Sequence, residues 1–81
     1  MTFKTVVKGS AGTEVHILQT ALRMLQYVGK DNKPIVIDGV CGENTVYAIN
    51  QFQKRQEVYG YPCGNGDGSF GAKCWTRLLG E

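Results

Sequence analysis

Few residues of this sequence are arranged in a way that suggests catalysis, and each of them has a simpler structural interpretation. Asp38 and Asp67 are an apparent carboxylate pair, and His16 is the single histidine. Paired carboxylates can act as general acid and base, and a histidine can activate a nucleophile. However, each aspartate precedes a glycine, and Asp-Gly is typical of a tight turn in which the aspartate bonds its own downstream backbone. His16 lies off the apolar stripe of a predicted helix, as a surface histidine does. We therefore predict no catalytic residue and expect that the chain is not an enzyme.

The cysteines Cys41, Cys63 and Cys74 do not predict a metal site. Their separations of 22 and 11 residues fit no zinc-binding pattern, and the histidine is far from them in the sequence. We interpret Cys41 and Cys74 as small buried apolar residues and Cys63 as a loop thiol. Three cysteines permit at most one internal disulfide, and the sequence leaves open whether a pair is bonded. No metal and no other cofactor is expected.

Length and composition are those of one small globular domain, residues 1–81. Apolar residues make up 42% and charged residues 20% of the chain, and the net charge is +2. A charge so weak and evenly spread argues against a nucleic-acid partner. The apolar runs are too short to cross a membrane, so no membrane insertion is expected. The N-terminal stretch MTFKTVVKGS lacks the apolar core and cleavage site of a signal peptide.

The spacing of apolar residues predicts three helices. The first is expected from Thr13 to about Gln26, with Gly29 as the stop that follows it. Its apolar face comprises Val15, Leu18, Leu22 and Leu25, widened by Ile17, Ala21 and Met24. The second begins after Gly42 and runs to about Gln56, where Val46, Ile49 and Phe52 repeat at every third position.

The third helix is short, follows Gly71 and ends at Gly80, with Trp75, Leu78 and Leu79 as its apolar face. Residues 30–34 are expected to form a turn, and residues 35–37 a short extended stretch whose side chains seal one end of a helical core. Residues 59–68, rich in glycine, are expected to form a loop.

An internal repeat connects these elements. DGVCGENTVYAI, which begins at Asp38, returns loosely 29 residues later as DGSFGAKCWTRL, which begins at Asp67. In both copies Asp-Gly forms a turn, a second glycine leads into a helix, and a small residue, Thr45 or Cys74, lies one turn inside it. KGSAGTEV near the N-terminus is a fainter third copy. Three such units predict an all-α fold, a small three-helix bundle.

The three motifs together resemble a known family. KGSAGTEVHILQTALRMLQY resembles the opening of type 1 peptidoglycan-binding domains, IDGVCGENTVYAINQFQKRQ their central signature, and DGSFGAKCWTRLLG their closing signature. The resemblance extends from Val7 to Gly80 and implies a non-catalytic three-helix module. Cys41 stands where the family usually has Phe, and Cys74 where it usually has Thr. The stretch from 56 to 66 is longer and richer in glycine than the usual linker.

The implied function is attachment to the bacterial cell wall. Such modules hold a wall-lytic or wall-remodelling enzyme on peptidoglycan, in bacterial autolysins, spore-cortex hydrolases and phage endolysins. The implied partners are therefore peptidoglycan, through its glycan strand or its stem peptide, and the catalytic domain of a parent enzyme. The implied location is extracellular, at the wall. A related helical module occurs in metalloproteinase pro-regions, so the alternative is a protein-binding or pro-region-like module on the same fold.

We predict that exposed aromatic rings and nearby polar groups bind the ligand, because sugar faces stack on rings while hydroxyl, amide and carboxylate groups need hydrogen-bond partners. Tyr47, beside the apolar stripe of the second helix, is the best candidate. Tyr27 should be half-buried with its hydroxyl outward, whereas Phe52, Phe70 and Trp75 should belong to the core. The predicted ligand-binding residues are Tyr27, Asp38, Gly39, Asn44, Tyr47, Gln51, Tyr61, Asp67 and Arg77. We expect the site where the two Asp-Gly turns and the helix starts after them meet, because helix N-termini offer N–H groups to a carboxylate.

Overall fold

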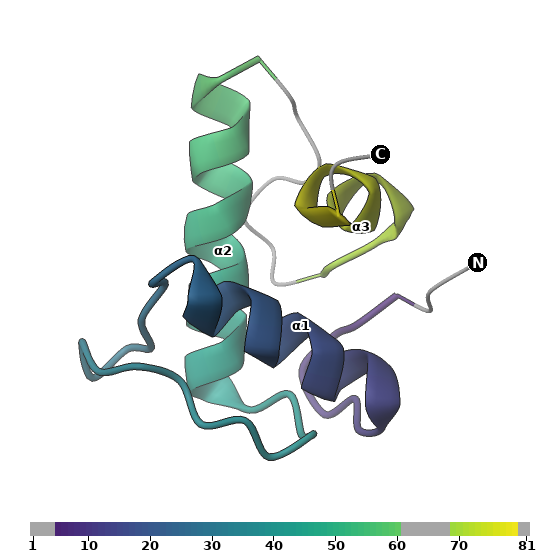
Figure 1. Ribbon diagram of the computed structural model, residues 1–81, viewed down its shortest axis with the longest axis vertical. Coiled ribbons are helices and arrows are strands. Elements are labelled where there is room, and N and C mark those ends of the chain that lie inside the picture. Colours follow the sequence, from purple (N-terminus) through teal and green to yellow (C-terminus); the bar gives the residue numbers. More distant parts are fainter. Residues whose placement is uncertain (1–4, 61–68, 80–81) are drawn as a thin grey trace.

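The structure, a computed structural model, describes residues 5–60 and 69–79. Within these residues the chain forms α1 (Thr13–Met24), α2 (Glu43–Val58) and α3 (Ala72–Leu79). In Figure 1, α2 stands upright, α1 crosses it, and α3 lies beside it. The described residues contain no strand beyond three isolated antiparallel bridges. The all-α, three-helix prediction is therefore confirmed, and both α2 and α3 begin directly after the predicted glycines.

The first helix ends two residues earlier than predicted and by a different device. Gln26, not a glycine, takes the left-handed conformation that stops it, with φ of 67°. The Tyr27 N–H donates to the Leu22 carbonyl at 3.0 Å, and the Gln26 N–H donates to the Arg23 carbonyl at 3.0 Å. This pair of bonds is a Schellman motif, which satisfies the last carbonyls of the helix. The expectation that Gly29 provides the stop is wrong.

The predicted turn is present between residues 28 and 34. Val28 forms an antiparallel bridge with Pro34, and Asn32 adopts a left-handed φ of 62°. Asp31 accepts a hydrogen bond from the Lys33 N–H at 3.1 Å, the local Asx bond that favours such turns. After the turn, Ile35 is buried in the core, as expected for a residue that seals one end of it.

Four aromatic side chains join the three helices through the core. The ring of Tyr27 meets Phe52 edge-on at 5.9 Å, Phe52 lies 5.6 Å from Phe70, and Phe70 meets Trp75 edge-on at 5.0 Å. Edge-to-face pairs at these distances stabilise a core beyond the area they bury. The core assignments of Phe52, Phe70 and Trp75 are confirmed, as is the burial of Cys41 and Cys74. The buried apolar residues are Val6, Val15, Leu18, Leu22, Tyr27, Ile35, Cys41, Ala48, Ile49, Phe52, Phe70, Cys74 and Trp75.

Two predicted core positions of the first helix are instead on the surface. Met24 is 79% exposed and Leu25 is 52% exposed. The helix ends at Met24, so Leu25 no longer follows the helical stripe that faces the core. Leu79, at the end of α3, is also exposed. His16 lies on the surface, as predicted.

A segment before α1, residues 6–12, connects the starts of the other two helices. Val6 and Phe70 exchange two backbone hydrogen bonds of 3.0 and 2.7 Å just before α3. Ala11 forms an antiparallel bridge with Val40, three residues before α2 begins at Glu43. We call residues 6–12 the N-terminal brace, because it fixes the approach of the chain to both helices.

Candidate recognition surface

The first Asp-Gly turn is held by a glutamine from α1. Gln19 is fully buried, and its Nε2 donates to Asp38 Oδ1 at 3.0 Å, to the Val40 carbonyl at 2.9 Å and to Thr45 Oγ1 at 3.0 Å. Its Oε1 accepts from the backbone N–H groups of Asp38 at 3.2 Å and Gly39 at 2.9 Å. We call this set the first glutamine clamp. Because these bonds occupy the polar groups on the inner side of the turn, few of those groups remain to bind a ligand.

Asp38 acts within this turn as the sequence predicted. Its Oδ1 accepts a hydrogen bond from the Val40 N–H at 3.0 Å. That backbone bond, followed by the bond from the Gln19 side chain, lowers the pKa of Asp38 below its ordinary value. Gly39 has φ of 76°, a conformation that side-chain-bearing residues rarely adopt, and lies beside the Gly12 carbonyl. Both residues are therefore needed by the turn itself.

A second glutamine repeats the arrangement before α3. Gln53, from α2 and fully buried, donates from Nε2 to the Ser69 carbonyl at 2.6 Å and to Cys74 Sγ at 3.4 Å. Ser69 and Cys74 follow Val40 and Thr45 by 29 positions each, the period of the sequence repeat. We call this set the second glutamine clamp. Asp67, the second predicted aspartate, lies outside the described residues, as do Tyr61 and Cys63.

Asn44 and Gln51 both face the segment that leads into the 30–34 turn. Asn44 Oδ1 accepts from the Lys30 N–H at 3.0 Å, and Gln51 Nε2 donates to the Val28 carbonyl at 3.2 Å. Gly29 lies so close that an added Cβ would be 2.6 Å from Asn44 Cβ. Gly29 is thus required for this close packing rather than for the end of α1.

Tyr47 lies between these two amides on the same side of α2. Positions 44, 47 and 51 are three and four residues apart, so their side chains follow one stripe of the helix. Tyr47 is 43% exposed, in agreement with its predicted partial exposure. Arg55 continues the stripe, and its guanidinium carbon lies 5.4 Å from the ring centroid of Tyr27. We call Asn44, Tyr47, Gln51 and Arg55 the α2 stripe.

Two predicted residues lie away from the exposed part of this stripe. Tyr27 is only 7% exposed, so the expectation of a half-buried ring is wrong: its face is covered by Phe52 and Arg55. Arg77, on α3, donates from Nε to Gln56 Oε1 at 2.6 Å. Gln56 is 12 residues beyond Asn44, which is roughly 18 Å at the rise of an α-helix. Arg77 therefore lies near the C-terminal end of α2, whereas Asn44 lies near its N-terminal end.

The starts of α2 and α3 are linked through the N-terminal brace. Residues 9–12 of the brace form backbone hydrogen bonds with Gly39 and Cys41. Val6, at its other end, forms backbone hydrogen bonds with Phe70. The helix starts named in the site prediction are thus arranged along one continuous segment. The prediction gave this segment no role of its own.

Sequence reasoning missed Gln19, although a signal for it is present. Both clamp glutamines directly follow a buried apolar residue, Leu18 in α1 and Phe52 in α2. A glutamine inside an apolar stripe, repeated in two helices, indicates a polar group that is buried for a structural purpose.

The described residues thus form a small helical domain with a polar and aromatic stripe on one helix and a tightly hydrogen-bonded turn before α2. Among the described residues, no group of three or more His, Cys, Asp or Glu side chains is placed to hold a metal ion. In the same part of the chain, the helices are too short or too polar to span a membrane.

The chain belongs to the peptidoglycan binding domain family, whose model matches residues 11–78. The match covers α1, α2 and all of α3 except its last residue, Leu79. No curated protein and no solved structure matches the chain. Family membership supports peptidoglycan as the binding partner and association with the cell wall as the setting.

Proposed function

We propose that this chain is a non-catalytic module that holds a wall-lytic or wall-remodelling enzyme, bacterial or phage-encoded, on peptidoglycan outside the cell. The observation that carries the proposal is the family match over residues 11–78. A single shallow site on a polymer binds modestly, but tethering raises the local concentration of an attached catalytic domain near its substrate. Attachment of this kind requires no catalytic group in the module itself.

The α2 stripe supports this function chemically. Tyr47 offers an exposed aromatic face on which the apolar face of a sugar ring can stack. On either side, Asn44 and Gln51 each use one half of their amide to hold the 28–30 segment. Within the described structure, Asn44 Nδ2 and Gln51 Oε1 have no hydrogen-bond partner. They are therefore a donor and an acceptor available to the hydroxyl and amide groups of a glycan or stem peptide.

The test is co-sedimentation of the purified chain with insoluble, protein-free peptidoglycan. The chain should pellet with the wall and stay in solution without it. Replacing Tyr47 with Ala should weaken binding by about 1–2 kcal/mol, roughly a five- to thirtyfold change in Kd, because a central aromatic contact is lost. The fraction pelleted over a series of peptidoglycan concentrations gives the Kd.

Tyr59→Ala is the matched control, because Tyr59 is also exposed, at 63%, but lies at the C-terminal end of α2. It should bind like the wild type. Equal weakening by both variants would move the site off the α2 stripe. A chain that stays in the supernatant would contradict the attachment function and favour a protein partner.

A further inference from the structure

A pocket of about 130 Å³ lies between the N-terminal brace and the first turn of α1. It is lined by Thr5, Val6, Ser10, Ala11, Glu14 and Val15. None of these residues was among those predicted to bind ligand. The volume is many times the roughly 10–15 Å³ that one water molecule needs, so the pocket can admit the end of a side chain.

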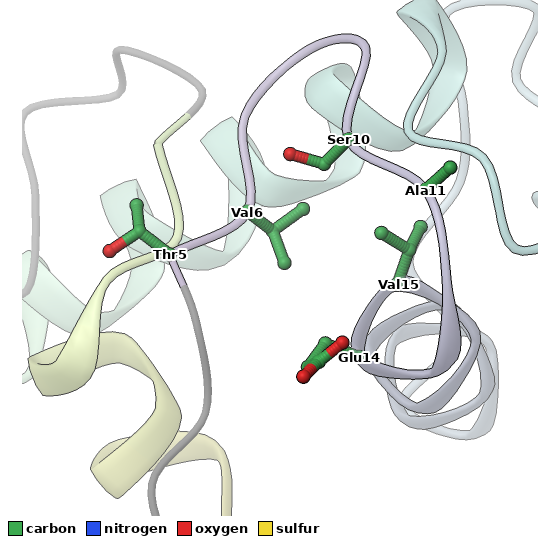
Figure 2. A pocket seen from close by; sticks show the side chains of 6 residues that line it. All are labelled: Thr5, Val6, Ser10, Ala11, Glu14 and Val15. Atoms are coloured by element: carbon green, nitrogen blue, oxygen red, sulfur yellow. The ribbon is translucent and has the colours of Figure 1, made fainter.

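The floor of the pocket is apolar. Val6 and Val15 are each 1% exposed, and Figure 2 shows their side chains turned toward one another across the space. Water over such a surface has few hydrogen-bond partners, so an aliphatic chain that displaces it is favoured. The floor therefore suits methylene groups.

The rim carries a negative charge and a hydroxyl group. Glu14 projects from the start of α1, below Val6 and Val15 in Figure 2. Across the part of the chain that the structure describes, its carboxylate makes no hydrogen bond or ion pair. Ser10 Oγ accepts the Val7 N–H at 3.0 Å and keeps a second lone pair. Among the described residues, no lysine, arginine or histidine lines the pocket.

An apolar floor beneath a carboxylate that has no partner among the described residues fits an alkylammonium group. The aliphatic carbons would lie on Val6 and Val15, while the ammonium would form an ion pair with Glu14. An anion is disfavoured, because the full charge of Glu14 outweighs the partial positive charge of about one half at the start of the helix. Peptidoglycan whose stem peptide contains lysine carries such a group wherever the lysine side chain is not cross-linked.

We propose that this pocket binds the free side-chain amine of the diamino acid in the peptidoglycan stem peptide. The inference rests on the proposed function and adds to it a preference for uncross-linked stems. It also gives the N-terminal brace a recognition role, because the brace supplies Val6 and Ser10 to the pocket.

The test uses the tripeptide L-Ala–γ-D-Glu–L-Lys and its Nε-acetyl form as probes. Amide NMR spectra of the full chain, recorded during titration with each probe, report both the affinity and the residues affected. The free amine should shift the signals of residues 10–15 and bind about three- to fivefold more tightly than the acetylated form, the range expected for one partly exposed ion pair.

Glu14→Gln retains the size of the side chain and removes its charge. In this variant the two probes should bind equally, because acetylation and the substitution remove the same ion pair. Glu57→Gln, which removes an exposed carboxylate from α2, is the matched control and should retain the preference. Equal binding of both probes to the wild type, or a preference that survives Glu14→Gln, would overturn the pocket assignment.

A parallel co-sedimentation separates this inference from the function on which it rests. Peptidoglycan whose free amines have been acetylated should pellet less wild-type chain than untreated peptidoglycan. Equal pelleting with both would overturn the amine preference while leaving wall attachment in place. Pelleting with neither would overturn wall attachment, and with it the role of the pocket.

Discussion

The two glutamine clamps place the same amide in two different chemical settings. In the first, Gln19 uses both ends of its amide: Nε2 reaches a carboxylate, a carbonyl and a hydroxyl, and Oε1 accepts two backbone N–H groups. In the second, Gln53 Nε2 reaches a carbonyl and a thiol, while Oε1 is buried and has no donor among the described residues.

The comparison explains why the sequence repeats loosely rather than strictly. The carbonyl and the side chain that each clamp binds are separated by five positions in both copies, Val40 to Thr45 and Ser69 to Cys74. The spacing is kept because one amide must reach both atoms. The acceptor type is not kept, because a thiol also accepts a hydrogen bond, although weakly. The two copies thus share the spacing of these residues but not their chemical type.

The largest expected effect comes from removing each clamp. Gln19→Leu should lower the free energy of unfolding by roughly 2–4 kcal/mol, because several polar groups lose their partner inside the fold. Gln53→Leu should cost roughly 1–2 kcal/mol, since fewer bonds are lost and an unsatisfied oxygen is removed with them. Urea denaturation followed by circular dichroism measures both. Equal costs would show that the two clamps are energetically equivalent and would break the comparison.

A smaller effect should follow when the first clamp is given the thiol of the second. Thr45→Cys replaces the hydroxyl that accepts from Gln19 by a weaker acceptor, and should cost about 1 kcal/mol. Thr45→Ser keeps the hydroxyl and removes a methyl group, so it measures the packing contribution alone. If the serine variant loses as much stability as the cysteine variant in the same urea series, the hydrogen bond is not the cause.

The smallest effect should be a pH dependence carried by Asp38 in the first clamp. Because its pKa is lowered in the folded state, the carboxylate stabilises the fold above the unfolded pKa of about 3.9, and this stability is lost as the pH falls through the lower folded pKa. The wild type should therefore exceed Asp38→Asn in urea midpoint at pH 6, and the difference should vanish toward pH 2. If the difference in urea midpoint persists at pH 2, its cause is the shape of the side chain and not its charge.

The parts of the fold that depend on local pattern could be predicted from the sequence. The starts of α2 and α3 follow from Gly42 and Gly71 in the repeat, and most core positions follow from apolar spacing. The end of α1 could not be predicted, because Gln26 adopts a left-handed φ that its residue type does not favour. The role of Gly29 depends on Asn44, 15 positions away, and no local pattern contains that contact.

The candidate site was predictable only in part, for the same reason. The exposure of Tyr47 follows from its place beside the helix stripe. The burial of Tyr27 depends on Phe52 and Arg55, which approach it only in the folded chain. The pocket beside Glu14 exists because the N-terminal brace pairs with residues from two distant parts of the chain.

The backbone hydrogen bonds between Val6 and Phe70 close the chain between them into a loop, which we call the ring. These residues are 64 positions apart, against 29 for the bridge between Ala11 and Val40. By loop-closure entropy alone, the longer ring costs about 0.7 kcal/mol more to close. Contacts between α1 and the first turn can therefore form earlier in folding, with closure of the ring as a late event. The pocket, which needs Val6 in place, is complete only after Val6 has paired with Phe70.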